Sequence, residues 1–186
     1  MEFTKYPITV HYLQVMSRDQ ILPKRSTDPS VTVTRVDNPE PDFLQWLYRT
    51  VGKEWYWASR YYWSLNQWSN RFADSAVSLW VMEYRSEPAG YYEFEEQQDG
   101  DIEFSSFGLL PAAIGKGLGG HMLTDGLERA FELGASRAWL HTCSLDHPNA
   151  LKNYQARGME LYKSEKDIQL IPHGWPLPSH LPSSRV

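Results

Sequence analysis

The stretch that decides the fold is Leu109–Gly120, which reads LLPAAIGKGLGG. It follows a strand-like run, and apolar residues recur at helical spacing directly after it, so it is a glycine-rich strand-to-helix turn. The first N–H groups of a helix have no intrahelical partner and carry partial positive charge, which attracts phosphate oxygens. Glycines allow a phosphate to approach closely, and Lys116 adds a full charge. The turn predicts a phosphate site, although a tight turn without a ligand would use the same residues.

The same glycines fit two other nucleotide-binding motifs less well. Gly115, Gly117 and Gly120 satisfy the G-x-G-x-x-G of dinucleotide-binding Rossmann folds. That motif belongs to the first strand–helix unit of a long parallel array, whereas here several predicted strands come earlier and fewer than about 70 residues follow. A P-loop does not fit, because Lys116 is followed by Gly117 where Ser or Thr should bind magnesium.

The whole chain has the composition of one soluble domain. Its 186 residues are enough to bury a single core, and the formal charge of -5 does not favour nucleic acid as a partner. The single Cys143 cannot form an intramolecular disulfide, and the N-terminus lacks a secretory signal, so a cytoplasmic protein is expected. No apolar stretch approaches the roughly 20 residues of a membrane-spanning helix, so no membrane contact is expected.

Periodicity along the chain predicts an α/β fold with a mixed sheet. The predicted strands are 8–15, 31–36, 77–84, 89–95, 102–110, 137–143 and 159–170. The predicted helices are 43–51, about 58–72, 118–132 and 148–156. The three central strands, 77–84, 89–95 and 102–110, follow one another at short intervals and should form an antiparallel meander. We expect one domain over 1–171 and a peripheral Pro-rich tail over 172–186.

The glycine-rich turn resembles the acetyl-CoA signature of the GNAT superfamily of N-acyltransferases, Arg/Gln-x-x-Gly-x-Gly/Ala after a strand and a proline. Gly117 and Gly119 match it, whereas Ile114 stands where the family usually has Arg or Gln. Because phosphate binding there rests largely on backbone amides, the departure weakens the match without removing it.

A second block lies at the expected distance downstream. Asn149–Met159, NALKNYQARGM, is similar to the family's Ala-Ile-x-x-Tyr-x-x-x-Gly-Phe, with Tyr154 at the tyrosine position. His147 stands seven residues before it, where the family often has Asn. The resemblance covers Val77–Leu170, and two matches at the right separation favour CoA over a dinucleotide.

The resemblance implies a single-domain GNAT-like fold with a mixed, mostly antiparallel twisted sheet flanked by helices. It also implies acetyl-CoA as cosubstrate, an amine-bearing small molecule or peptide as acceptor, and no metal; a homodimer is left open. A non-catalytic acyl-CoA-binding or regulatory domain is the alternative. The cofactor-binding residues that it implies are Leu109, Leu110, Ile114, Gly115, Lys116, Gly117, Leu118, Gly119, Gly120 and Asn149.

The resemblance further implies that the backbone of Leu109 and Leu110 pairs with the pantetheine arm, and that one of their N–H groups polarises the thioester carbonyl. A primary amine then attacks directly. Tyr154 is the candidate acid for the leaving thiolate, since the ordinary pKa of a phenol, about 10, lies above that of a thiol, about 8.5. A core aromatic on a short helix is the competing interpretation of Tyr154.

Glu103 is the candidate general base, because such enzymes often carry a carboxylate on this strand that relays the amine proton through water. A Glu alternating with apolar strand residues can equally face solvent. Glu93 and Glu95 on the preceding strand are weaker candidates of the same kind.

Two further groups of residues have both a functional and a structural interpretation. His141, Cys143, Asp146 and His147 could suggest a metal or thiol site, but their spacing fits neither, and strand packing is the simpler explanation. The aromatic residues could line an acceptor pocket for an apolar, aromatic or cationic group, or fill the core. They are Trp46, Trp55, Trp57, Tyr61, Tyr62, Trp63 and Trp68.

Overall fold

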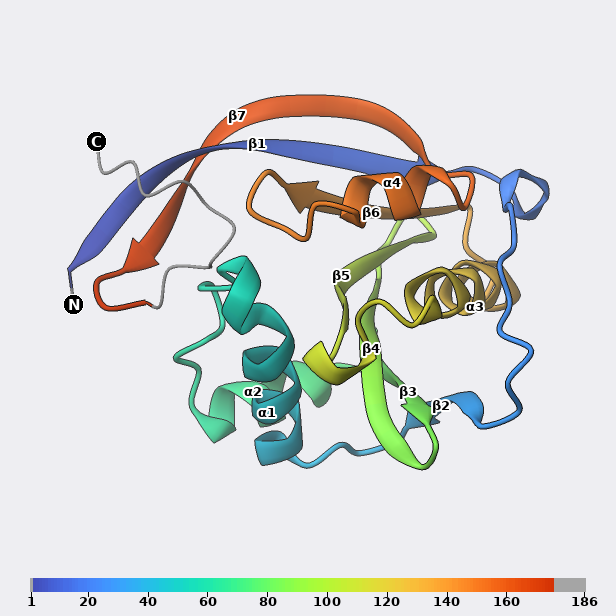
Figure 1. The fold of residues 1–186 in the computed structure, drawn as a ribbon, viewed down its shortest axis with the longest axis horizontal. Helices are drawn as coiled ribbons and strands as arrows, with labels where there is room; N and C mark the ends of the chain where they lie inside the picture. The colour runs from blue at the N-terminus through green and yellow to red at the C-terminus, as the bar shows by residue number, and fades with distance from the viewer. Residues whose placement is uncertain (1, 176–186) are drawn as a thin grey trace.

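A seven-stranded, twisted, mostly antiparallel sheet forms the body of the protein, with helices on both faces (Figure 1). The computed structural model describes residues 2–175. The strands are β1 Phe3–Val15, β2 Val31–Val36, β3 Val77–Tyr84, β4 Glu87–Glu96, β5 Asp101–Leu109, β6 Arg137–Cys143 and β7 Glu160–Pro172. The α-helices are α1 Pro41–Gly52, α2 Leu65–Phe72, α3 Leu118–Glu132 and α4 Ala150–Gln155; the 3-10 turns are η1 Arg18–Gln20, η2 Lys53–Trp55 and η3 Pro111–Ala113. The predicted fold class is confirmed.

The strand order is β2-β3-β4-β5-β6-β1-β7. The predicted meander is present as β3, β4 and β5, paired antiparallel. On one face, α3 packs Met122, Leu123 and Leu127 into the core of the sheet, and all three are fully buried. On the other face, α1 and α2 cover Leu79, Val81 and Tyr91. None of the helices in residues 2–175 combines the length and the apolar character needed to cross a membrane.

Two predicted boundaries are wrong. The strand expected over 8–15 begins at Phe3, as β1. The helix expected over about 58–72 begins only at Leu65, as α2. The chain turns before it, with Tyr56 in the left-handed region at φ 56. Ser64 then caps α2 by accepting a hydrogen bond from the Gln67 N–H, 3.3 Å away. The aromatic residues that suggested a longer helix are placed by turns and packing.

The predicted tail 172–186 is described only at its start. Pro172 ends β7, and Trp175 is buried. Its ring lies 4.3 Å from that of Tyr61, and its Nε1 donates to the Lys53 carbonyl at 3.0 Å. Residues 176–186 lie outside the described part of the chain.

The N-terminal strand lies inside the sheet. β1 pairs antiparallel with β6 over Val10–Val15 and with β7 over Phe3–Gln14. Figure 1 shows β1 and β7 as long curved strands beside each other above α4. β1 therefore joins β6 to β7, and the half-sheet β6-β1-β7 depends on it.

β5 and β6 separate soon after they meet. Their parallel pairing consists of Asp101–Glu103 with Arg137–Trp139, and the ladder ends there. The rest of β5 continues to Leu109 beside β4 alone. An open split therefore lies between the two halves of the sheet.

The segment 16–30 returns from β1 to β2 across α3. Its Leu22 N–H donates to the Arg157 carbonyl at 3.1 Å, and its Lys24 N–H donates to Thr124 Oγ1 at 2.9 Å. The Ser26 N–H donates to His121 Nδ1 at 3.1 Å, so that nitrogen must be unprotonated. The segment 16–30 is thereby fixed against the first half of α3.

A buried ion cluster holds the α1–α2 region on the sheet. Glu93 of β4 is 1% exposed and accepts hydrogen bonds of 2.9 Å from Arg60 to both carboxylate oxygens. Arg71 of α2 donates to the same carboxylate at 2.7 and 2.8 Å. Ser105 donates at 2.8 Å from the β-bulge in β5. The carboxylate of Glu93 is therefore held by two arginines and a serine, which gives it a structural role.

Replacing Glu93 by Gln should destabilise the protein by about 3–5 kcal/mol, because Arg60, with a side chain 16% exposed, loses its counter-charge and Arg71 keeps only the half-exposed Glu95. The matched control is Glu95→Gln. Glu95 also accepts from Arg71, at 2.6 Å, but its side chain is 37% exposed, so its loss should cost about 1 kcal/mol or less. Denaturant unfolding measures both, and equal losses would contradict a buried cluster centred on Glu93.

The attachment of the segment 16–30 should depend on pH through His121. Burial lowers the pKa of His121 below its ordinary 6.5. The carboxylates of Asp125 and Glu128 oppose this lowering, and the charge of Arg25 adds to it. Because the folded pKa lies below the unfolded one, this contribution to stability is complete above about pH 6.5 and is lost as the pH falls through the folded value. Thermal unfolding across this range should show the effect in the wild type. His121→Gln keeps an acceptor that does not titrate and should flatten the dependence; an unchanged slope would contradict it.

Candidate functional site

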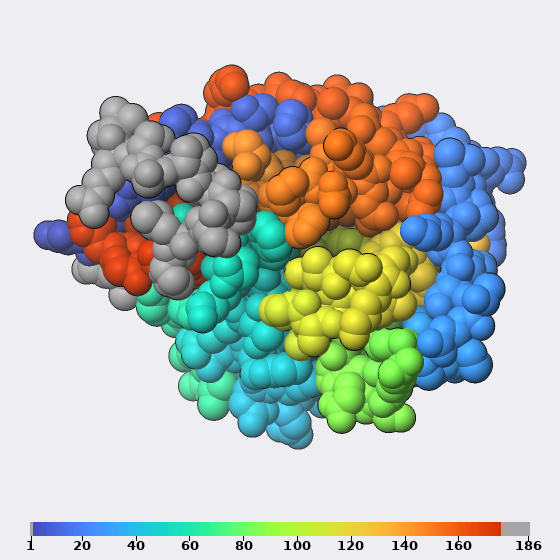
Figure 2. Space-filling model, in the orientation of Figure 1, coloured from blue at the N-terminus to red at the C-terminus, as the bar shows by residue number. Residues whose placement is uncertain are grey.

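A cavity of about 750 Å³ opens at the split between β5 and β6. It extends from the turn before α3, past α4, to the region between η2 and the β6–α4 loop. Figure 2 shows the corresponding hollow between the yellow surface of the turn, the orange surface around α4 and the cyan surface of the α1 region. It brings together residues from both predicted motifs.

The open edge of β5 forms one wall of this cavity. The Leu110 N–H donates to the Ala89 carbonyl of β4 at 2.9 Å. Hydrogen-bonded and non-hydrogen-bonded pairs alternate along an antiparallel ladder, so the next pair, Leu109 with Gly90, is not hydrogen-bonded. The N–H and C=O of Leu109 therefore point away from β4, towards the split. Phe107, two residues earlier, has the same orientation.

The glycine-rich turn, where the sequence predicts a phosphate site, forms one end of the cavity. Gly115 and Gly117 have φ values of 82 and 75, which side chains rarely adopt, and Gly117 is the N-cap of α3 without a side-chain cap. The N–H groups of the first turn of α3 therefore lack intrahelical partners. The members of the turn that line the cavity are Ile114, Gly115, Gly117, Gly119 and Gly120.

The structure places three predicted cofactor residues elsewhere. Leu110 and Leu118 are core residues with 7% and 4% exposure. Lys116 holds its ammonium 5.3 Å from the centre of the Tyr84 ring. Among the residues described, these three are not part of the cavity wall, whereas Leu109 and Asn149 are.

The second motif lies across the cavity from the turn. Asn149 is the N-cap residue of α4, and Asn153 donates weakly to the Gly119 carbonyl at 3.4 Å. Tyr154 is buried with its ring edge against Phe107, the centroids being 5.8 Å apart. Burial raises the pKa of Tyr154 above its ordinary value, and the Asp146 carboxylate raises it further. Tyr154 is therefore a neutral phenol at physiological pH.

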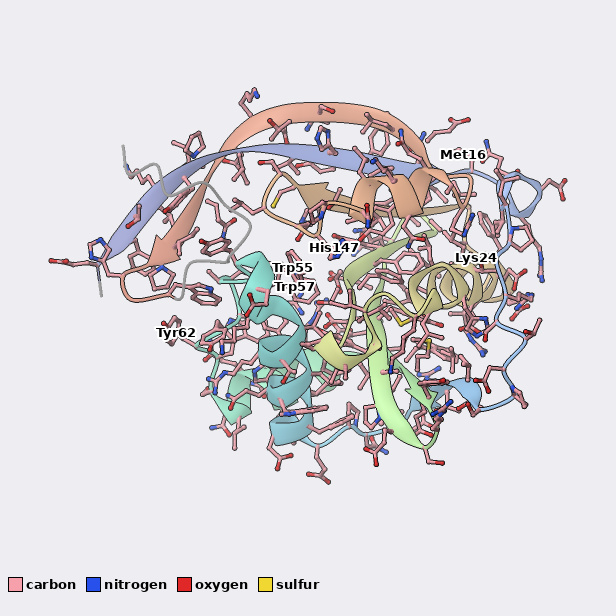
Figure 3. All side chains as sticks on the ribbon, viewed as in Figure 1. Met16, Lys24, Trp55, Trp57, Tyr62 and His147 are labelled. Atoms are coloured by element: carbon pink, nitrogen blue, oxygen red, sulfur yellow. The ribbon has the colours of Figure 1, made fainter. Side chains whose placement is uncertain are left out.

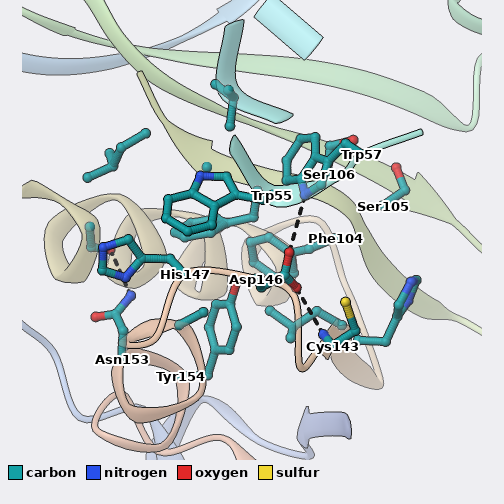
Figure 4. Close-up of a pocket in the computed structure, with 18 of the residues that line it drawn as sticks. Trp55, Trp57, Phe104, Ser105, Ser106, Cys143, Asp146, His147, Asn153 and Tyr154 are labelled. Atoms are coloured by element: carbon teal, nitrogen blue, oxygen red, sulfur yellow. Dashed lines mark hydrogen bonds between the residues drawn. The ribbon is translucent and has the colours of Figure 1, made fainter. Parts of the chain in front are cut away.

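Asp146 is a fixed carboxylate beside Tyr154. It accepts hydrogen bonds from Thr142 Oγ1 at 2.6 Å, from the Cys143 N–H at 2.9 Å and from Trp57 Nε1 at 3.3 Å. Figure 4 shows it between Trp57 and Cys143. Burial and then Asp146 raise the pKa of Cys143 to about 11, so its thiol is protonated and a poor nucleophile.

Within residues 2–175, no group of three or more metal-ligating side chains could hold an ion.

Glu103 lies at the apex of the split, in the last pair of β5 with β6. Its side chain is 15% exposed; Gln97 Nε2 donates to it at 3.2 Å, and His141 Nδ1 lies 3.6 Å away. Phe107, the neighbour of Tyr154, is four positions after Glu103 along β5. Four positions of extended strand span about 13 Å. Glu103 and Tyr154 therefore lie in different parts of one cavity.

The end of the cavity beside η2 is partly aromatic. Trp55, Tyr56 and Trp57 line the cavity, and the Trp55 and His147 rings lie 4.9 Å apart (Figure 3). Both interpretations of the aromatic cluster hold for part of it. Trp68 is core at 1% exposure, whereas Trp46 and Tyr62 are 44% and 52% exposed.

Sequence reasoning missed several residues of the cavity wall. Asn153 is four residues from Asn149 on the same short helix, so helical spacing could have indicated it. Lys24, Arg60 and Asp167 come from separate parts of the chain, and no local pattern joins them to the motifs.

The model of the Acetyltransferase (GNAT) family matches residues 41–159. A comparison with curated protein sequences finds no match. Among solved structures, a GCN5-related N-acetyltransferase from Kribbella flavida is similar, with TM-score 0.61 and 19% identity, covering 90% of this chain and 61% of that one. Spermidine N-acetyltransferase from Vibrio cholerae, in complex with CoA and spermine, has TM-score 0.59 and 18% identity, covering 77% of this chain and 94% of that one.

An aminoglycoside acetyltransferase from an uncultured soil metagenomic sample has TM-score 0.59 and 15% identity, covering 71% of this chain and 90% of that one. The chain spans 52% to 66% of the length of five similar structures, which are the Kribbella protein and four others. At these identities the structures support the fold. Because the family model matches well over half of the sequence, this chain belongs to the acetyltransferase (GNAT) family.

Proposed function

We propose that this protein transfers an acetyl group from acetyl-CoA to a primary amine of a small molecule or peptide by direct attack. The observation that carries the proposal is the continuity of the cavity. It joins the unpartnered N–H groups of α3 to the open edge of β5, Tyr154 and a carboxylate-lined end. A pyrophosphate, an extended arm and an amine each have a complementary surface along it.

The residues then have distinct roles. The Leu109 N–H donates to the thioester oxygen as negative charge develops there, since the Leu110 N–H is already bound to Ala89. The amine nitrogen bonds to the carbonyl carbon, the C–S bond breaks, and the electron pair leaves on sulfur. Tyr154 donates a hydrogen bond to that thiolate, which takes its proton from solvent on release. The proton that the amine loses passes through water to Glu103 and on to solvent.

Tyr154 is a weaker acid than a free phenol, so complete proton transfer to a thiolate is uphill. Its contribution is a hydrogen bond that strengthens as charge develops on sulfur. Tyr154→Phe should lower kcat about 10- to 100-fold and leave KM for acetyl-CoA nearly unchanged. Tyr62→Phe, at an exposed position, is the control. Thiol release measures both, and an unchanged kcat in Tyr154→Phe would remove the phenol from the mechanism.

The negative charges at the end of the cavity away from the glycine-rich turn favour a cationic acceptor. Glu103, Asp146 and Asp167 line the cavity, and the nearest cation in its wall, Arg60, is neutralised by Glu93. Glu95 also lines the cavity, but its charge is paired with Arg71. Aromatic rings beside carboxylates suit an ammonium group. We expect the acceptor to carry a second cationic group besides the reacting amine.

A panel of amines tests this acceptor class. Diamines should give higher kcat/KM than monoamines of equal length, and Asp167→Asn should reduce the diamine value about fivefold while sparing monoamines. Glu160→Gln, on the same strand and outside the cavity wall, is the control. Equal kcat/KM for both amine classes would contradict the expectation. Binding of acetyl-CoA without turnover on any amine would favour the non-catalytic alternative.

A further inference from the structure

The segment 16–30 brings a lysine to the phosphate end of the cavity from outside residues 41–159, the part that matches the family. Its Leu22 N–H donates to the Arg157 carbonyl after α4, and its Lys24 and Ser26 N–H groups donate to Thr124 and His121 of α3. The ion pair of Arg25 with Glu128 is half-exposed and adds little to this attachment. Figure 3 labels Lys24 beside α3. The position of Lys24 is therefore set by contacts on both sides of it.

The Lys24 side chain crosses the first turn of α3. A Cβ built on Gly120 would lie 2.7 Å from Lys24 Cδ, and a Cβ built on Gly117 would lie 4.0 Å from Lys24 Nζ. The stem therefore lies over Gly120, and the ammonium reaches the N-cap. Arg157 approaches the same glycine, with its NH1 2.7 Å from the built Cβ of Gly120. Only a residue without a side chain allows both cations to pack there.

This arrangement places like charges together. The N-terminus of α3 is already positive, and its first turn holds no acidic residue. Among the described residues, neither Lys24 nor Arg157 has a carboxylate within ion-pair distance. Lys24 is exposed and Arg157 half-buried, so solvent screens part of this repulsion, and an anion bound between them and the amides would offset the rest. The family's usual Arg or Gln is Ile114 here, so the turn itself does not supply that side chain.

We propose that Lys24 binds the pyrophosphate of the cosubstrate together with Arg157 and the amides of α3. This rests on the proposed function, because it assumes CoA in the cavity. The segment 16–30 is then part of the cofactor site. Lys24 supplies the side-chain charge that the turn does not bring there, since position 114 is Ile and the Lys116 ammonium faces Tyr84.

The test is Lys24→Met, measured with ligands that differ in phosphates. By calorimetry, CoA and dephospho-CoA, which share the pyrophosphate, should each bind about tenfold more weakly to the variant. The kcat/KM for S-acetylpantetheine, which has no phosphate, should be unchanged. A loss with CoA alone would place Lys24 at the 3′-phosphate, and a loss with all three ligands would indicate a general structural effect; either result overturns the proposal.

Arg25→Met is the matched control, since it removes the same charge from the neighbouring residue while Lys24 remains. Its affinity for CoA should stay within about twofold of the wild type. Equal losses in both variants would show that docking of the segment 16–30 is what matters, and would overturn the proposal. If the wild type binds and turns over acetyl-CoA normally and Lys24→Met is unaffected, only this inference fails. If the wild type does not bind acetyl-CoA, the proposed function fails as well.

Discussion

The separation of β5 from β6 is the constraint on which the rest of the structure depends. Buried backbone N–H and C=O groups need partners, and β6 leaves those of Leu109 and Phe107 without any from the sheet. A soluble protein retains such an edge where a ligand can complete it. The turn before α3 follows directly from this edge, so the Leu109 N–H of the strand and the N–H groups of the first turn of α3 face one cavity. The N–H groups of Leu110, Ala113, Ile114 and Lys116 between them are already bonded to backbone carbonyls.

A split sheet needs other connections to hold its halves together, and the N-terminal part of the chain provides them. β1 joins β6 to β7 on one side of the split. The segment 16–30 then passes over α3 and leads into β2, which pairs with β3 at the opposite edge of the sheet. The chain outside the family match therefore closes the domain around the cavity, and the cofactor end and the stability of the fold depend on the same segment.

The sequence allowed prediction of what is local. Residues 118–132 form a helix because their apolar spacing is strong, and the meander follows from short strands with turns between them. The turn and Tyr154 were identified because each belongs to a short contiguous motif. The insertion of β1 between β6 and β7 could not be predicted, since pairing between residues more than 100 positions apart has no local signal. Lys24 was missed for the same reason, because its role depends on where the segment 16–30 docks.

The charges of the cavity are segregated along its length, and this bears on reactivity. Lys24 lies at the phosphate end, whereas Glu103 and Asp167 lie at the other. A carboxylate beside the reacting amine would stabilise its ammonium form and so oppose attack, because only the free amine is nucleophilic. Glu103, about 13 Å along β5 from the neighbour of Tyr154, can attract a distant cation without this cost. Asp146 is beside Tyr154, but hydrogen bonds from Thr142, Cys143 and Trp57 already satisfy its carboxylate.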